Sequence, residues 1–203
     1  MSADVAMAKQ PTSFAFDAAN AEAARKIVLR YPAGRQASAV LPLLDLAQRQ
    51  AGGWLPRSAM DHVAGLLDMA PIRVYEVATF YSMFNLNPVG KYHVQICRTT
   101  PCWLRGSDAL RKVCESKLGV GLKQMTDDGL FTVSEVECLG ACCNAPMVQI
   151  NDDFYEDLTP ESFGRLLDAL KRGDAPGAGS QEGRRGSEPV KERHTLLDER
   201  RRA

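Results

Sequence analysis

The sequence lacks a long hydrophobic run and an excess of charge of either sign. Lysine and arginine together number 25 in its 203 residues, and aspartate and glutamate also number 25. This balance does not favour the capture of nucleic acid or of an anionic membrane surface. No apolar run approaches the roughly 18 to 20 residues that a membrane-spanning helix needs. We therefore expect a soluble, globular protein that meets a membrane only through partners.

The N-terminus also lacks the marks of a targeting signal. No long apolar stretch follows Lys9, as a secretory signal requires, and Asp4, Asp17 and Glu22 are acids of a kind that mitochondrial presequences avoid. We expect a cytoplasmic, reducing compartment, in which clustered cysteines serve as metal ligands more often than as disulfides.

Helical spacing of apolar residues dominates the first part of the chain. Gly52 and Gly53 interrupt it and Pro71 suits the first turn of the last segment, so that residues 18–87 predict a bundle of four short helices. Ser58 is a candidate N-cap for the third helix. The positions expected to face the interior are Ala21, Ala24, Ile27, Val28, Val40, Leu43, Leu44, Ala47, Val63, Leu66 and Leu67.

Between residues 88 and 172 the period changes. Alternation of polar and apolar residues predicts a strand over 91–96, and Phe131, Val133 and Val136 mark a second strand. A helix lies between the two, and a strand, a helix and a strand in this order favour a parallel crossover. The two strand ends are then expected at one edge of the sheet.

Further turn and cap signals complete this part of the chain. Ser107 is the candidate N-cap of the helix between the strands, and Gly119 would end that helix. Residues 147–155 predict a hairpin around an Asn-Asp-Asp turn, followed by a helix that Thr159 caps and Pro160 begins. The predicted order is strand, helix, strand, strand, strand, helix.

The two ends of the chain carry weaker patterns. Residues 1–17 show no periodicity and predict a flexible N-terminal arm. Residues 173–203 combine glycine with mixed charge and have little to bury, which predicts a disordered C-terminal tail. A partner-docking extension is the alternative for this tail.

Four of the six cysteines form two close pairs, Cys97 with Cys102 and Cys138 with Cys142. Each pair follows one strand of the predicted crossover, so both are expected in loops at the same sheet edge. Four thiolates that meet there would hold a compact metal centre. The other two cysteines differ, because Cys114 lies on the apolar face of a predicted helix and Cys143 directly adjoins a ligand candidate.

Three chemistries fit four cysteines at these spacings. An iron–sulfur cluster is favoured, because thiolates suit iron with inorganic sulfide. Structural zinc stays open, although its usual knuckle has two residues between paired cysteines and neither pair here does. A disulfide or a redox-active thiol pair is the third alternative. His62, His93 and His194 show no ligand spacing, and we assign them no role.

Residues next to the pairs give further indications. Gly106 and Gly140 would let the main chain turn or approach sulfur closely. Arg98 and Arg105 flank the first pair and could lower the cost of reducing a negatively charged cluster, and two solvated arginines are the alternative.

Several motifs in a fixed order make a family recognisable. The run 128–132 (Asp-Gly-Leu-Phe-Thr) and the run 138–146 (Cys-Leu-Gly-Ala-Cys-Cys-Asn-Ala-Pro) resemble the signature of the 2Fe-2S small subunits of respiratory complex I, the NADH:quinone oxidoreductase. Residues 97–102 are similar to the first cysteine pair of that family, and residues 77–84 to the segment before its cluster domain. The likeness covers roughly residues 18–172.

The resemblance implies an α+β fold, in which an N-terminal helical bundle precedes a thioredoxin-like 2Fe-2S ferredoxin domain. It implies that Cys97, Cys102, Cys138 and Cys142 bind one 2Fe-2S cluster, and it assigns no catalytic residue to this chain. Thioredoxin-like folds often have a cis bond at the position that Pro146 occupies here.

The resemblance also implies a role in electron transfer. Family members exchange single electrons between their cluster and FMN on a larger, NADH-oxidising subunit in the peripheral arm of the complex. This chain would then be a subunit of NADH dehydrogenase, held at the inner face of the plasma membrane by the complex. No Gly-x-Gly-x-x-Gly sequence stands between a strand and a helix, so FMN and NADH are expected on the partner subunit.

Three other functions stay open from the sequence. The equivalent small subunit of a soluble NAD-linked formate dehydrogenase or hydrogenase looks alike. A zinc-stabilised docking module would use the same cysteines without redox chemistry. A stand-alone thioredoxin-like ferredoxin is the third, although a helical region of about 70 residues would be superfluous in a small diffusible carrier.

Overall fold

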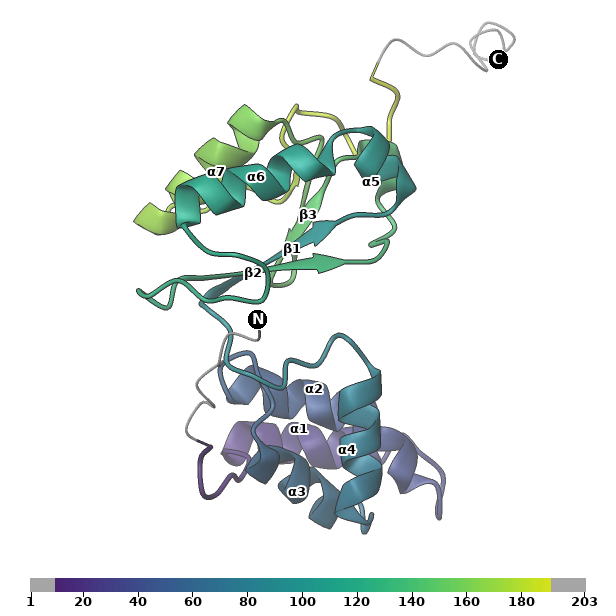
Figure 1. Cartoon of the computed structure of the whole chain (residues 1–203). Helices are drawn as coiled ribbons and strands as arrows, with labels where there is room; N and C mark the ends of the chain where they lie inside the picture. The colour runs from purple at the N-terminus through teal and green to yellow at the C-terminus, as the bar shows by residue number, and fades with distance from the viewer. Residues whose placement is uncertain (1–9, 191–203) are drawn as a thin grey trace, which may run out of the picture. The chain divides into compact units, whose positions relative to one another are not determined.

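The structure is a computed structural model that describes residues 10–190 (Figure 1). The chain divides into two compact units, Met1–Lys91 and Tyr92–Ala203, and each is described by itself. In its described residues the first unit is helical, whereas the second combines helices with one sheet. The predicted α+β class is confirmed.

The helices of the first unit pack around one apolar core, to which each contributes buried side chains. Leu43 and Leu44 are fully buried in this core together with Val63 and Val74, and Pro71 begins its helix as predicted. The helices are α1 (Ala18–Val28), the 3-10 helix η1 (Gln36–Ala39), α2 (Val40–Gln50), α3 (Arg57–Leu66) and α4 (Pro71–Phe80).

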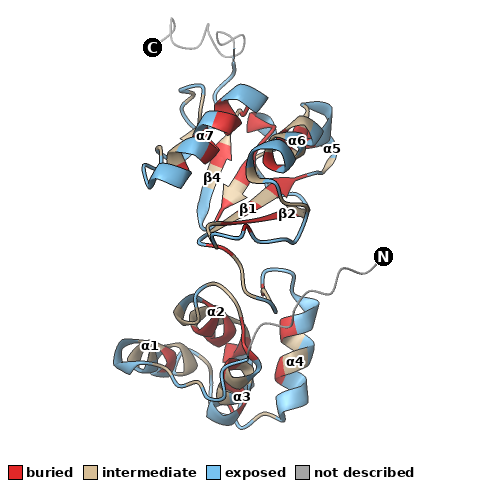
Figure 2. Ribbon diagram, turned by 60° about the vertical axis from the view of Figure 1, so that its left-hand side comes forward, coloured by how far each residue is buried: buried red, intermediate tan, exposed pale blue. Residues whose placement is uncertain are grey.

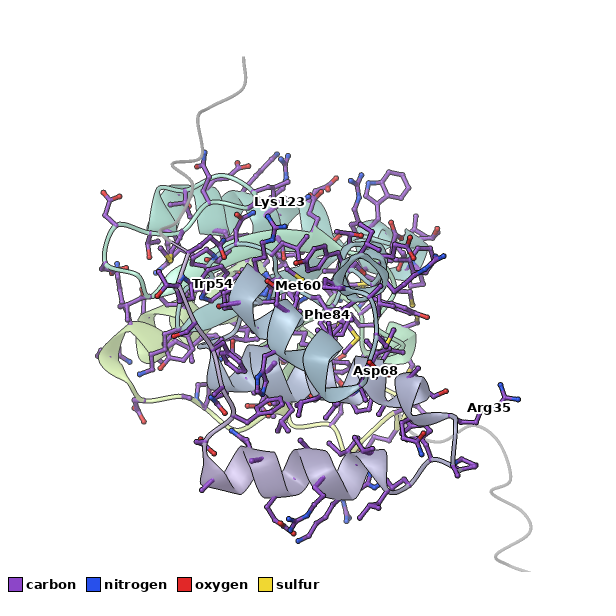
Figure 3. The ribbon with its side chains drawn as sticks, turned by 90° about the horizontal axis from the view of Figure 1, so that it is seen from below. Arg35, Trp54, Met60, Asp68, Phe84 and Lys123 are labelled. Atoms are coloured by element: carbon purple, nitrogen blue, oxygen red, sulfur yellow. The ribbon has the colours of Figure 1, made fainter. Side chains whose placement is uncertain are left out.

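The segment after α4 closes this core. Phe84 is buried in it, and Met60 of α3 packs against the same cluster; both are labelled in Figure 3. The side chain of Gln48 holds the segment from two sides, because its amide donates to the Met83 carbonyl at 3.1 Å and its oxygen accepts from the Asn85 N–H at 2.7 Å. These bonds fix the chain before it enters the second unit.

Two predictions for α3 are wrong. The extended backbone of Pro56 already leads the chain into the helix, so the helix begins before Ser58, which therefore does not cap it. Leu66, expected in the interior, is 50% exposed. The buried face of α3 runs through Ala59 and Val63, and Leu66 falls on its flank at the last helical residue.

Residues 10–17, part of the predicted flexible arm, are placed by aromatic contacts. Phe14 and Phe16 both lie edge-on to the ring of His62, with ring centroids 5.6 and 5.2 Å away. Burial of these rings explains the difference from the prediction, which considered only periodicity. Residues 1–9 lie outside the described part of the chain.

We expect Phe14→Ala to destabilise the helical unit by about 1 to 2 kcal/mol, because it removes apolar contact area and two edge-on aromatic pairs. Urea denaturation followed by helical circular dichroism measures this change. Leu29→Ala, at a side chain that is mostly exposed, is the matched control and should shift the midpoint little. Equal shifts in the two variants would contradict the contact.

The second unit contains a mixed five-stranded sheet in the order β2-β1-β3-β4-β5. The neighbours β1 and β2 run parallel, as predicted, and β3 and β4 form the predicted antiparallel hairpin. Helices α6 and α7 lie side by side over the sheet (Figures 1 and 2). The elements are β1 (Tyr92–Cys97), α5 (Thr100–Leu104), α6 (Ser107–Leu118), β2 (Phe131–Val136), η2 (Cys142–Asn144), β3 (Val148–Ile150), β4 (Asp153–Glu156), α7 (Pro160–Arg172) and β5 (Gly179–Ser180).

The core of this unit lies between the sheet and the two long helices. Val94 and Ile96 of β1 are buried against Leu110 of α6 and against Phe163 and Leu167 of α7. In Figure 2 the buried residues of both helices form stripes on the side that faces the strands. This packing holds β1 and β2 in register, so that Cys97 lies opposite Val136 at the ends of the two strands.

The caps of α6 and α7 test three sequence predictions. Thr159 caps α7 as expected, since its hydroxyl accepts from the Ser162 N–H at 3.1 Å and the Ser162 hydroxyl accepts from the Thr159 N–H. Gly119 ends α6 in the left-handed region, also as expected. Ser107 is not the cap of α6, because Gly106, with φ of 96°, occupies that position.

Residues 173–190 differ from the predicted disordered tail. After α7 the chain returns to the sheet, where β5 pairs in parallel with β4. Arg184 then forms a largely buried ion pair with Asp157 at 2.9 Å. The composition of the segment gives no sign of these contacts, because they depend on one strand edge and one ion pair rather than on an apolar face. Residues 191–203 of the predicted tail lie outside the described residues.

Candidate metal centre

The first cysteine pair lies at the carboxyl end of β1. Cys97 is the last residue of that strand, and its N–H donates to the Met147 carbonyl at 3.4 Å. Cys102 lies in α5, a five-residue helix that the sequence analysis did not predict, which turns its thiol back toward the strand end. Both side chains are about 1% exposed and pack with Ala145 and Met147. This pair is therefore enclosed by protein.

The second pair lies in the loop that follows β2. Cys138 comes two residues after the strand, and Cys142 begins the short helix η2. Their sulfur atoms are 3.4 Å apart, and both residues are exposed. Because β1 and β2 are parallel, both cysteine loops leave the sheet at the same edge, as the spacing predicted.

Contacts between the two loops bring the pairs together. The Thr99 hydroxyl lies 3.4 Å from the Cys97 sulfur and also lowers the pKa of Cys138, so one side chain acts on both loops. The hydrogen bond with Cys138, followed by burial and the charges of nearby thiols that include Cys97, raises the pKa of Cys142. The charge of Cys142 in turn contributes to the raised pKa of Cys102. Cys142 thus lies within electrostatic reach of both thiols of the first pair.

Hydrogen bonds to sulfur favour the thiolate at one member of each pair. Burial raises the pKa of Cys97, but the Thr99 hydroxyl and the N–H groups of Thr99 and Leu139 outweigh it and lower that pKa overall. The Gly140 N–H, with the Cys142 thiol, lowers the pKa of Cys138. Donors of this kind offset the negative charge of sulfurs that bind a metal.

The partner thiol of the buried pair has the opposite shift. Burial, followed by its hydrogen bond with Cys97, raises the pKa of Cys102 to about 12, although the Met147 N–H acts against this. Cys97 is thus the more acidic of the two thiols, and Cys102 is the one that keeps its proton to higher pH. Binding a metal to both sulfurs would release that proton.

The donor set of this site suits a dinuclear cluster. Across residues 10–190, no group of three or more His, Cys, Asp and Glu side chains is placed to hold one metal ion. The four thiols instead group two and two, which is how a 2Fe-2S cluster takes two thiolates at each iron. Together with the N–H donors to sulfur, this donor set fits the iron–sulfur cluster that the sequence favoured over zinc.

Gly140 and Gly106 have positive φ angles, of 90° and 96°. No atom lies within 4 Å of the position that a Cβ would occupy at Gly140, so its role is the backbone turn rather than close approach. That turn aims the Gly140 N–H at Cys138. Gly106 performs a different task, because it caps α6 behind the first pair.

We expect Gly140→Ala to weaken the candidate centre, because a side chain at this φ costs about 1 to 3 kcal/mol unless the turn rearranges. Rearrangement would move the N–H away from Cys138 and speed the loss of metal to a chelator. Gly65→Ala in α3 is the control, since that glycine has an ordinary φ and open space around it. Equal rates of metal loss in the two variants would contradict the role of the turn.

The remaining candidates from the sequence have ordinary roles. Cys114 is fully buried in the core of the second unit, which confirms it as a packing residue, and burial raises its pKa to about 12. Arg98 pairs with Glu135 at 3.1 Å rather than with a thiol. Arg105 reaches the second loop, because its Nε donates to the Ala145 carbonyl at 3.4 Å.

Residues that the sequence analysis missed surround the first pair. Thr99 joins both loops, and its place between Cys97 and Cys102 was the signal that could have identified it. An open hollow of about 390 Å³ lies beside the pair, lined by Arg98, Thr99, Thr100, Trp103 and Glu137. Trp103 is more than half exposed at its rim.

The peptide bond between Ala145 and Pro146 is cis, at the position where thioredoxin-like folds often have one.

No helix among residues 10–190 is both long enough and apolar enough to cross a membrane.

Comparisons with known proteins identify the family of this chain. The family model of the thioredoxin-like 2Fe-2S ferredoxins matches residues 24–171. A protein of Rickettsia conorii that is named as a subunit of NADH-quinone oxidoreductase is 62% identical over 160 residues, which cover 79% of this chain and 96% of the relative. A Dictyostelium discoideum protein named NADH dehydrogenase (ubiquinone) flavoprotein 2, mitochondrial, is 50% identical over 187 residues, or 92% of this chain and 76% of the relative.

Among solved structures, the chain is similar to part of an NAD⁺-reducing NiFe hydrogenase in the air-oxidized state. The TM-score is 0.57 at 22% identity, and the match covers 64% of this chain and 23% of the hydrogenase chain. At this identity the likeness concerns the fold alone.

Proposed function

The chain belongs to the thioredoxin-like 2Fe-2S ferredoxin family, and we propose that within it this protein is the electron-transfer subunit of the NADH-oxidising module of an NADH:quinone oxidoreductase. Its four paired cysteines would hold one 2Fe-2S cluster. FMN and NADH would bind to a partner subunit of the same complex. The protein is then a subunit of an oxidoreductase without a complete active site of its own.

The observation that carries the proposal is the convergence of Cys97, Cys102, Cys138 and Cys142 at one sheet edge, with hydrogen-bond donors at three of the four sulfurs, those of Cys97, Cys102 and Cys138. Relatives at 58 to 62% identity over most of their length are named as subunits of NADH-quinone oxidoreductase, which supports the choice of complex. The solved hydrogenase chain is only 22% identical to this one, so the equivalent subunit of a soluble hydrogenase or formate dehydrogenase is not favoured.

The residues of this chain have three tasks in that function. When bound, the cluster supplies one-electron redox chemistry beside a two-electron flavin. Cys97 and Cys102 anchor the site inside the protein, whereas Cys138 and Cys142 lie at the surface, where an electron can pass to a partner over a short distance. Thr99 and the N–H groups of Leu139 and Gly140 neutralise part of the charge on sulfur and so favour reduction.

The partners follow from the proposed complex. They are the flavin-bearing, NADH-oxidising subunit and other subunits of the peripheral arm, and the complex would hold the chain at the cytoplasmic face of the plasma membrane. Assembly in an NADH-quinone oxidoreductase is the association that the names of the relatives support.

Metal and sulfide analysis after anaerobic purification of the complex tests the proposal. We expect about two irons and two acid-labile sulfides in the cluster of this chain. Stoichiometric zinc without acid-labile sulfide would falsify the electron-carrier function and support the zinc-stabilised docking module. Purification by a tag on this chain should also recover a flavin-containing partner.

A further inference from the structure

The chain beyond α7 forms a strap across the second unit, residues 174–188, which we call the C-terminal strap (yellow end of the described chain in Figure 1). It adds β5 to the edge of β4, where Tyr155 pairs with Gly179 and Glu156 with Ser180. The Gln181 N–H donates to the Glu156 carbonyl at 3.0 Å. The family model matches residues 24–171, so the strap lies beyond the matched region.

Past this pairing, Arg184 of the strap reaches the loop of the second cysteine pair. Its guanidinium donates to the Asp157 carboxylate at 2.9 Å, to the Cys143 carbonyl at 2.9 Å and to the side-chain oxygen of Asn144. The side chains of Arg184 and Asp157 are each only 10% exposed. The planar guanidinium group of Arg184 thus joins the strap to the turn after β4 and to the two residues that follow Cys142.

Asn144 makes the second set of bonds between the strap and this loop. It is almost fully buried, and its amide donates to the Glu156 carboxylate at 2.6 Å and to the Gly186 carbonyl at 2.8 Å. The main-chain carbonyl of Asn144 accepts from the Asp157 N–H at 2.8 Å. The polar groups of this network are therefore satisfied by one another. Removing Arg184 would take the donor from the Cys143 carbonyl and from the Asn144 side-chain oxygen, while Asp157 would keep the Ser180 hydroxyl.

Protection of the sheet edge alone does not explain these contacts. The pairing of β5 with β4 already covers that edge. A buried Arg–carboxylate pair is costly to form unless its geometry is fixed by further hydrogen bonds, and here two of those bonds end on the cysteine loop. The loop is otherwise exposed at Cys138, Cys142 and Cys143, so it depends on such bonds for a fixed shape.

We propose that the C-terminal strap positions the exposed half of the cluster site, with Arg184 holding the Cys142–Asn144 turn in the shape that presents Cys142 to the metal. Arg184 is a positioning residue, since it acts through the turn and not on the cluster. The inference rests on the proposed function, because it takes Cys138 and Cys142 as ligands.

The test compares Arg184→Gln with Arg185→Gln in the full-length chain carrying its cluster. Arg185 is the neighbouring exposed arginine, and within residues 10–190 its side chain makes no hydrogen bond to the cysteine loop. Loss of iron to an anaerobic chelator should be about 10- to 100-fold faster in Arg184→Gln, in line with the loss of metal affinity that follows changes in residues that orient metal ligands. Its electron paramagnetic resonance spectrum after reduction should also shift, while Arg185→Gln should match the unchanged chain in both.

Arg184→Lys separates positioning from stability. Lysine can still pair with Asp157 but cannot donate in three directions from one plane, so the unfolding midpoint should fall less than in Arg184→Gln while iron loss still accelerates. This variant also serves if Arg184→Gln does not fold. An unchanged rate and spectrum in Arg184→Lys, or in folded Arg184→Gln, would overturn the inference. Absence of acid-labile sulfide from the unchanged chain would instead refute the proposed function.

Discussion

Serine at any one of Cys97, Cys102, Cys138 or Cys142 is expected to abolish stable binding of the cluster. A hydroxyl is a far poorer ligand for iron than a thiolate, and each pair loses one of its two sulfurs. Iron and acid-labile sulfide should fall from about two of each per chain to near zero after purification. The visible absorption of the cluster should disappear with them.

The buried and exposed pairs should differ in what remains. Cys97 and Cys102 are enclosed by protein, so a serine there leaves a poorly accommodated hydroxyl, whereas Cys138 and Cys142 are open to water. Traces of unstable cluster are therefore expected first in variants of the exposed pair. Absorption spectra recorded directly after anaerobic reconstitution, and again after storage at room temperature, would show the difference.

Cys114→Ser and Cys143→Ser are the matched controls. Cys114 belongs to the apolar core, so its variant should lose stability but keep iron and sulfide. Cys143 is exposed and its carbonyl, not its thiol, binds Arg184, so serine should change little. Loss of the cluster in Cys114→Ser together with its retention in Cys142→Ser would show that the ligand assignment is wrong.

Phe163→Ala is expected to destabilise the second unit by about 3 to 5 kcal/mol. Phe163 of α7 is fully buried against the sheet, and truncation removes a large apolar surface and leaves a cavity. Because typical domains are stable by only about 5 to 15 kcal/mol, this change takes away a large part of the total. Urea denaturation of the cluster-free chain, followed by circular dichroism, would measure it.

Arg165→Ala on the same helix is the control for that measurement. Arg165 is exposed, so its removal should shift the free energy of unfolding by less than about 0.5 kcal/mol. A similar loss in both variants would contradict packing of Phe163 on the sheet as the source of the effect, because alanine does not lower the helical propensity of α7 at either position. The two outcomes are separated by several kcal/mol.

The parts of the fold that local patterns specify could be predicted from the sequence. Thr159 and Pro160 mark the start of α7, and alternation from Tyr92 onward marks β1, because each signal comes from neighbouring residues. The convergence of the two cysteine pairs at one edge followed from the same patterns, through the parallel crossover. In the structure the loops that carry the two cysteine pairs both leave the sheet at that edge, in agreement with the prediction.

The errors arise where a contact joins residues far apart in the sequence or where the backbone replaces a side chain. Ser58 and Ser107 are good capping types, but Pro56 and Gly106 begin the helices through their backbone angles instead. The strap depends on Arg184 meeting a carboxylate 27 residues earlier, which no periodicity reveals. Thr99 could be recognised as a bridge only once the second loop was placed beside the first.

The position of the strap at the C-terminal side of the cysteine pairs also sets the order in which the site forms during translation. Synthesis proceeds from the N-terminus, so both cysteine pairs leave the ribosome before Arg184 does. Strands β1 to β4 and the two covering helices can form by the time residue 172 has emerged, yet β5 and the final contacts of the turn after Cys142 form only when the strap has followed. Delivery of iron and sulfide would then be best timed after translation, and a chain cut short just beyond α7 would fold while keeping its cluster site open.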